Sequence, residues 1–190
     1  MKKNLKRAAS WLTVASIYAL PFIASESQGA FDAFYKIETI PGESTDDKHG
    51  GWIQILAFNH GVLREVDRDP DTGQRQVKGT LAKDLNIIKR VDKSSPLLFL
   101  QAVSGQPMAE HKISFVGPNS AGERKQYLQV TLSNVLVKGY SISGATEGAN
   151  EKPVEEVTLA YDKIQWTYTE LGADGNEYKV ESEFDFAKPR

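Results

Sequence analysis

The stretch Tyr127-Leu128-Gln129-Val130-Thr131-Leu132-Ser133 decides the fold class, because apolar and polar side chains alternate along it. A period of two places each set of side chains on its own face of an extended chain, so residues 127–133 predict a half-buried β-strand. The same alternation recurs at 157–161, 164–168 and 180–186. These segments predict an antiparallel meander in the C-terminal third of the chain. The Asp174-Gly175 pair, which favours a tight turn, would join the last two strands.

Further strands are predicted upstream, at 31–37, 52–58, 85–91 and 112–116. Segment 52–58 (WIQILAF) is apolar at nearly every position, so we expect that strand to be covered on both sides. One short helix is also predicted. Ser95 is the expected N-cap, Pro96 suits the first helical position, and Gly105 would end the helix. Many strands with a single helix indicate a mainly β protein, a barrel or sandwich with the helix packed on one side or end.

Composition narrows the function classes. The chain has 190 residues, enough for one domain with its own core, and no cysteine, which excludes disulfides, thiolate metal sites and cysteine nucleophiles. A formal charge of −2 argues against nucleic acid as the main partner. The sequence contains no phosphate-binding loop, dinucleotide fingerprint or nucleophile elbow, and we expect no cofactor.

Residues 1–29 differ from the rest of the chain. Four cations within the first seven residues precede the apolar run Trp11–Ala24, and small residues follow it. This order is typical of a secretory signal peptide, and the run is shorter than the ~20 residues needed to cross a bilayer. We therefore predict a signal-peptide-like segment at 1–29, a folded domain at 30–190 and no stable membrane span. The alternatives for 1–29 are an amphiphilic extension or sequence upstream of the true start codon.

A long charged segment spans Arg64–Thr80 and cannot belong to the core. Long connections in compact domains tend to be functional, and the alternative is a mobile hairpin. Its charged residues are Arg64, Glu65, Asp67, Arg68, Asp69, Asp71, Arg75 and Lys78.

One cluster could carry chemistry. Glu43, Asp46, Asp47 and His49 could ligate a hard cation or support a hydrolase, but residues 41–47 also have the composition of a tight turn. The adjacent acids Glu155 and Glu156 would face opposite sides of a strand and make no acid/base pair. The sequence therefore favours the turn, and it favours a protein that is not an enzyme.

Three stretches together resemble one known family. They are AFDAFYKI at 30–37, GESTDDKH at 42–49 and GWIQILAF at 51–58. This opening resembles that of Hcp, the tube protein of bacterial type VI secretion systems. The segments 92–98, 127–143 and 157–168 also look like the helix entry and C-terminal strands of that family.

The resemblance implies a β-barrel of two antiparallel sheets with a lateral helix. It also implies a homohexameric ring, rings stacked into a secreted tube, effectors carried in the lumen, and tip and sheath proteins as partners. By position, Asn59 would face the lumen and the charged residues of 64–78 would contact the neighbouring ring. Members of the family ordinarily start near the equivalent of Ala30, so residues 1–29 depart from the family pattern. A working signal peptide there would send this chain to the periplasm. The alternative is therefore an exported binding module that is not built into a tube.

Overall fold

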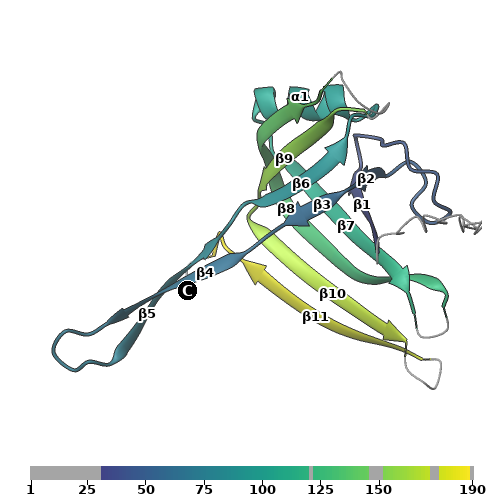
Figure 1. The fold of residues 1–190 in the computed structure, drawn as a ribbon. Coiled ribbons are helices and arrows are strands. Elements are labelled where there is room, and N and C mark those ends of the chain that lie inside the picture. The colour runs from purple at the N-terminus through teal and green to yellow at the C-terminus, as the bar shows by residue number, and fades with distance from the viewer. Residues whose placement is uncertain (1–30, 120–121, 146–151, 172–175, 189–190) are drawn as a thin grey trace, which may run out of the picture.

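The computed structural model describes residues 31–119, 122–145, 152–171 and 176–188 (Figure 1). Eleven strands and one helix are assigned within these residues. In chain order they are β1 (Asp32–Ile37), β2 (Ile53–Ile55), β3 (Ala57–Asn59), β4 (Val62–Arg68), β5 (Arg75–Ala82), β6 (Leu85–Arg90), α1 (Ser95–Ser104), β7 (Met108–Pro118), β8 (Arg124–Ser143), β9 (Val154–Ala160), β10 (Lys163–Leu171) and β11 (Glu177–Asp185). The expected 1–29 segment and the Asp174-Gly175 turn lie outside the described residues.

Nine strands form one antiparallel, barrel-like sheet, and β4 and β5 form a separate two-stranded sheet. The main sheet runs in the order β2-β1-β7-β8-β9-β6-β3, and β10 and β11 branch from β8. The core faces of the central strands include Ile113 and Phe115 of β7 and Val130 and Leu132 of β8. The prediction of a mainly β protein with one short helix is confirmed.

The 20-residue strand β8 organises the molecule. Leu128–Ser133 pairs with β10, whereas Leu136–Ser143 pairs with β9. Asn134 stands between these segments with a φ of 53°, a left-handed conformation that Asn adopts more readily than most residues. Its side-chain amide also donates to Asp162 in the turn between β9 and β10. The predicted meander is therefore wrong in its connections, because β9 and β10 pair with two halves of β8 and not with each other.

The predicted strand at 52–58 is two strands. Ile53 and Ile55 are buried in β2, which pairs with β1, whereas β3 pairs with β6. The chain bends at Leu56, whose backbone N–H donates to Ile88, and the Leu56 side chain is exposed. The expectation that residues 52–58 form one strand covered on both faces is therefore wrong for the single chain. The apolar run reflects a change of partner strand rather than a strand buried on both faces.

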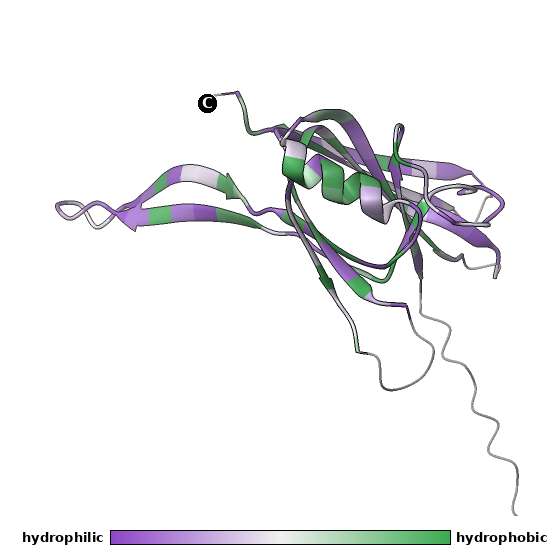
Figure 2. Ribbon diagram, turned by 90° about the horizontal axis from the view of Figure 1, so that it is seen from above, coloured by the Kyte–Doolittle hydropathy of each residue, from purple (hydrophilic) through white to green (hydrophobic). Residues whose placement is uncertain are grey.

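The helix begins one residue earlier than predicted, with Ser94 as its N-cap. Gly105 ends it with a φ of 62° and donates its N–H to the Gln101 carbonyl, as expected of a C-terminal glycine. Leu98 is buried against the barrel. Viewed from above, α1 lies across the upper end of the barrel (Figure 2), and the β4–β5 hairpin extends far from the barrel on one side (Figures 1 and 2).

Candidate functional site

The charged segment folds as a hairpin that leaves the barrel. The seven residues of β4 are all exposed, and so are most residues of β5. At its tip, Asp69 Oδ1 accepts the backbone N–H groups of Asp71 and Thr72, both at 2.9 Å, and Gly73 has a φ of 68°. These backbone hydrogen bonds lower the pKa of Asp69. The segment is therefore a two-stranded hairpin with regular structure of its own.

The two faces of this hairpin differ in chemistry. Cross-strand register places Val66 opposite Val77 and Arg68 opposite Arg75 on one face, where Arg64 also donates to Thr80 at 2.9 Å. Residues between these positions face the other side. There Leu63 stands opposite Leu81, and Asp67 forms an ion pair with Lys78 that raises the pKa of Lys78. The acidic strand residues Glu65 and Asp67 therefore lie away from the three arginines.

The structure brings all eight predicted hairpin residues onto one protrusion, in β4, the turn and β5. The apolar component of the hairpin was not predicted, although the alternation from Val62 to Arg68 contained the signal. Val66 and Val77 are 50% and 60% exposed, which is unusual for an opposed valine pair. Asn59 is set apart from this group. It ends β3 on the barrel, is exposed, and stands opposite Asn86 of β6.

Aromatic contacts hold the base of the hairpin. The His60 imidazole lies 2.5 Å from the Tyr161 hydroxyl, and its ring centroid lies 5.9 Å from that of Trp166. Phe186 packs on Tyr161 from the C-terminal side. Burial lowers the pKa of His60 and raises the pKa of Tyr161 to about 12, so this pair is neutral near pH 7. The hairpin thus leaves the barrel from a packed base.

The acidic cluster at residues 43–49 is a turn with a buried anchor. Asp46 Oδ1 accepts the backbone N–H groups of Lys48 and His49, and also lies 2.8 Å from His49 Nδ1. The His49 hydrogen bond lowers the pKa of Asp46. Glu43 accepts the Lys93 backbone N–H instead of joining Asp46. Among the described residues, no group of three or more histidine and acidic side chains could hold a metal ion. The tight-turn interpretation is confirmed.

An Asp-His-Ser constellation nevertheless occurs here, because His49 Nε2 lies 2.8 Å from Ser114 Oγ on β7. Nucleophilic catalysis would require a reachable serine. Ser114 is 0% exposed and donates its hydroxyl hydrogen to Gln126, and the His49 ring is covered by Phe34 at 4.5 Å. The arrangement holds the 43–49 loop on the sheet and offers no substrate a path to the hydroxyl.

A buried ionic network lies beneath α1. Lys89 Nζ contacts Glu155 Oε2 at 2.7 Å, Asp92 Oδ1 at 2.8 Å and Ser95 Oγ at 3.2 Å. The Tyr140 hydroxyl donates to the second Glu155 oxygen at 2.6 Å, and burial with this bond raises the pKa of Tyr140. Lys89 and Glu155 are fully buried and directly opposed across β6 and β9. The network fixes the start of the helix on the barrel.

This network was not predicted, although the sequence contained a signal. Lys89 continues the inward alternation of Leu85 and Ile87, and a cation at an inward position requires a partner. The expectation for the adjacent acids is confirmed, because Glu155 is buried and Glu156 is exposed on the other face.

Comparison with known proteins identifies the family. The family described as "Type VI secretion system effector, Hcp" matches residues 34–168, well over half of the chain. The chain belongs to the Hcp family. This confirms the resemblance seen in the opening residues.

Individual Hcp relatives agree with this assignment. Protein hcp1 of Pseudomonas aeruginosa is 33% identical over 147 residues, covering 77% of this chain and 88% of that protein. The major exported protein of the same organism is 28% identical over 159 residues, covering 82% and 91%. A solved type six secretion system protein has a TM-score of 0.73 at 28% identity, covering 82% of this chain and 96% of its own. Hcp1 from Salmonella typhimurium has a TM-score of 0.66 at 25% identity, covering 83% and 96%.

Family membership settles the function class. Hcp proteins are structural, non-enzymatic proteins of the type VI secretion system, so the chain is not a hydrolase. The family is secreted, and its members form hexameric rings. No helix among the described residues is long and apolar enough to span a membrane.

Proposed function

We propose that this Hcp protein assembles into homohexameric rings that stack into a secreted tube, with effectors carried in the lumen and tip and sheath proteins as further partners. The observation that carries the proposal is the β4–β5 hairpin. It exposes opposed apolar pairs and arginines that the barrel leaves uncovered. Large exposed apolar groups on a regular element mark an interaction surface. In this proposal the hairpin residues, from Arg64 to Lys78, form the ring-to-ring contact.

A free strand edge supports lateral assembly. In the part of the chain that the structure describes, β11 pairs only with the strand β10, so it forms an edge of the main sheet. Such edges invite pairing with another chain unless a neighbour covers them, and a ring closes when one heterologous interface repeats. Asn59 is exposed on the barrel and remains our candidate for the lumen surface.

The test is imaging and sizing of the protein recovered from expressing cells. We expect ring particles and short stacks in negative-stain images, and a hexamer mass by light scattering at micromolar concentration. A strictly monomeric species would contradict the proposal and favour the exported binding module. Replacing Asn59 with cysteine and labelling it tests the lumen assignment, since a lumen position should react with a small maleimide but resist a protein-sized one.

The route by which the chain is exported is tested separately. We propose that residues 1–29 act as a signal peptide and that the mature protein begins near Ala30, which implies passage through the periplasm. N-terminal sequencing of the recovered protein decides this. Retention of Met1 would contradict export by that route and would be consistent with assembly in the cytoplasm before secretion.

A further inference from the structure

One face of the hairpin carries positive charge that the described residues do not neutralise. Arg64, Arg68 and Arg75 share this face with Val66 and Val77. Arg68 and Arg75 stand directly opposite each other, and like charges at opposed positions repel. Arg68 donates only to the Gly73 carbonyl, at 3.3 Å, and no described carboxylate pairs with Arg75. This apolar and basic face would be stabilised by an apolar surface flanked by carboxylates.

A surface of that kind lies at the distal end of β10 and β11. A cavity of about 520 Å³, which we call the mouth, is lined by Phe31, Tyr127, Tyr168, Glu170 and Glu177, together with Lys125 and other residues near the β7–β8 turn. Phe31 and Tyr168 are 43% and 45% exposed although they border the core. The aromatic walls complement the hairpin face in polarity, and Glu170, for which no described cation forms an ion pair, supplies an opposite charge. Register places Glu177 on the other face of β11, with Glu181, and Lys125 forms its own ion pair with Glu123.

The mouth is open because β10 and β11 extend past the packed part of the sheet. Register places Tyr168 opposite Leu128 and Val180, on the same inward face as buried Val130. Leu128 still packs against the core, whereas Val180 is 68% exposed. Apolar side chains that continue beyond the core of their own chain mark an interaction surface.

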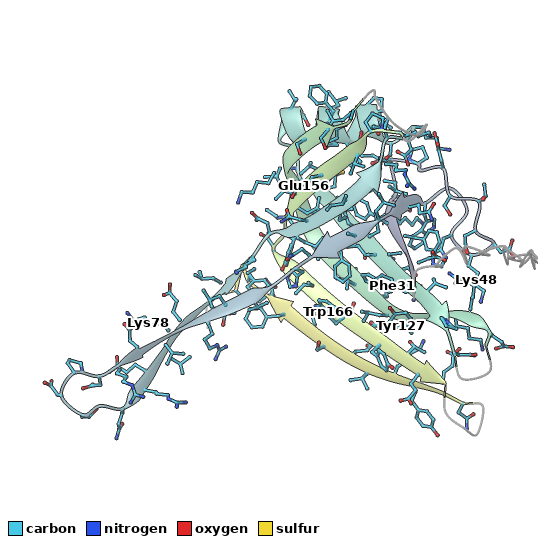
Figure 3. The ribbon with its side chains drawn as sticks, viewed as in Figure 1. Phe31, Lys48, Lys78, Tyr127, Glu156 and Trp166 are labelled. Atoms are coloured by element: carbon cyan, nitrogen blue, oxygen red, sulfur yellow. The ribbon has the colours of Figure 1, made fainter. Side chains whose placement is uncertain are left out.

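The two surfaces lie on different sides of one molecule. In Figure 3 the hairpin residue Lys78 is on the far left, whereas Phe31 and Tyr127 lie at the right of the barrel. The hairpin runs away from the barrel, so it points away from its own mouth (Figures 1 and 3). The hairpin of one chain therefore does not reach the mouth of the same chain.

We propose that the mouth of each copy receives the basic face of the hairpin from a second copy of this chain in the adjacent ring. Val66 and Val77 pack on Phe31 and Tyr168. Arg68 and Arg75 pair with Glu170 and lie over the tyrosine rings, where a cation is attracted by the aromatic face. This inference rests on the proposed ring-stacking function and names the receiving surface. A contact between two different surfaces does not close on itself along the stack, so it propagates rings into a tube.

Charge reversal at both surfaces tests the pairing. We expect Arg75→Glu alone and Glu170→Arg alone to form hexamers that do not stack. Hexameric rings repeat the contact six times, so a loss of about threefold per contact compounds to roughly 700-fold in ring-to-ring affinity. A mixture of the two variants should recover stacks. In that mixture the hairpin that carries Arg75→Glu fits the mouth that carries Glu170→Arg, and the unchanged surfaces fit each other.

Matched controls reverse the same charges outside the two surfaces. Lys138→Glu lies on the part of β8 that pairs with β9, and Glu156→Arg lies on the exposed face of β9. Both should stack like the unaltered protein, as seen by negative stain and sedimentation. Stacks that persist in Arg75→Glu, or a mixture that does not recover, would overturn the mouth assignment even where rings and tubes form. Failure of the unaltered chain to form any ring would instead overturn the proposed function.

Discussion

Lys89 should contribute more to stability than its partner Glu155, although the two form one ion pair. Replacing Lys89 with Met leaves Glu155, which is fully buried, and Asp92, whose side chain is 11% exposed, without their shared cation. Removing one member of a buried pair costs about 3–5 kcal/mol because a charge stays buried and unpaired. Against the ~5–15 kcal/mol typical of a domain, this is a large loss.

Glu155→Gln should cost less. Lys89 keeps Asp92 at 2.8 Å and Ser95 at 3.2 Å, and the Gln amide oxygen still accepts one hydrogen bond. We expect a loss of about 1–3 kcal/mol, typical of a weakened buried hydrogen bond. The double variant Lys89→Met with Glu155→Met should be more stable than Lys89→Met alone, because no carboxylate then remains fully buried.

The assay is urea unfolding followed by tryptophan fluorescence, at two protein concentrations because assembly adds a concentration-dependent contribution. Lys138→Met is the matched control, since its pair with Asp84 is largely exposed and should change the free energy of unfolding by at most about 1 kcal/mol. A loss for Lys89→Met no larger than that of the control, or smaller than that of Glu155→Gln, would refute this account of the network.

Three further predictions concern other parts of the molecule. Burial lowers the pKa of His111 to about 4, so at acidic pH the unfolded chain binds a proton at this imidazole more readily than the folded chain does. The free energy of unfolding should therefore fall by up to about 3 kcal/mol as pH drops from 6.5 to 4. A His111→Gln variant should show a flatter pH profile in chemical unfolding. Gly42→Ala should prevent normal folding, because its Cβ would lie 2.2 Å from the Trp52 carbonyl oxygen. Gly105→Ala should cost only about 1 kcal/mol of stability, because Gly105 has a positive φ but open space around it. Circular dichroism melts compare the two variants, and a larger loss for Gly105→Ala would contradict this prediction. Replacing residues 64–80 with a short turn should leave the barrel folded and monodisperse, since β4 and β5 pair only with each other in the described chain; loss of the folded β-sheet signal would count against that independence.

Local alternation was enough to predict most strands and the face each presents. Leu132 and Ile164 were expected to be inward, and both are buried. Gly105 was expected to end the helix, and it does so with positive φ. The N-cap was displaced by one residue because Ser95 uses its hydroxyl to accept hydrogen bonds from Asp92 N–H and Lys89, leaving Ser94 at the cap position. The turn at residues 43–49 was also expected, since Asp and Ser side chains bond to nearby backbone without long-range help.

The amino-acid sequence by itself determined the strand content, the solvated character of residues 64–80 and the family, because periodicity and local turn chemistry depend only on neighbours in the chain. The tertiary structure decided which strands pair, and hence that β9 and β10 divide β8 between them. It also decided that Lys89 meets Glu155, 66 residues away, and that His49 reaches Ser114. A period of two specifies the face of a residue but not the strand opposite it. Which residues of two strands meet depends on the register of the strands, and the packing of the whole core selects that register.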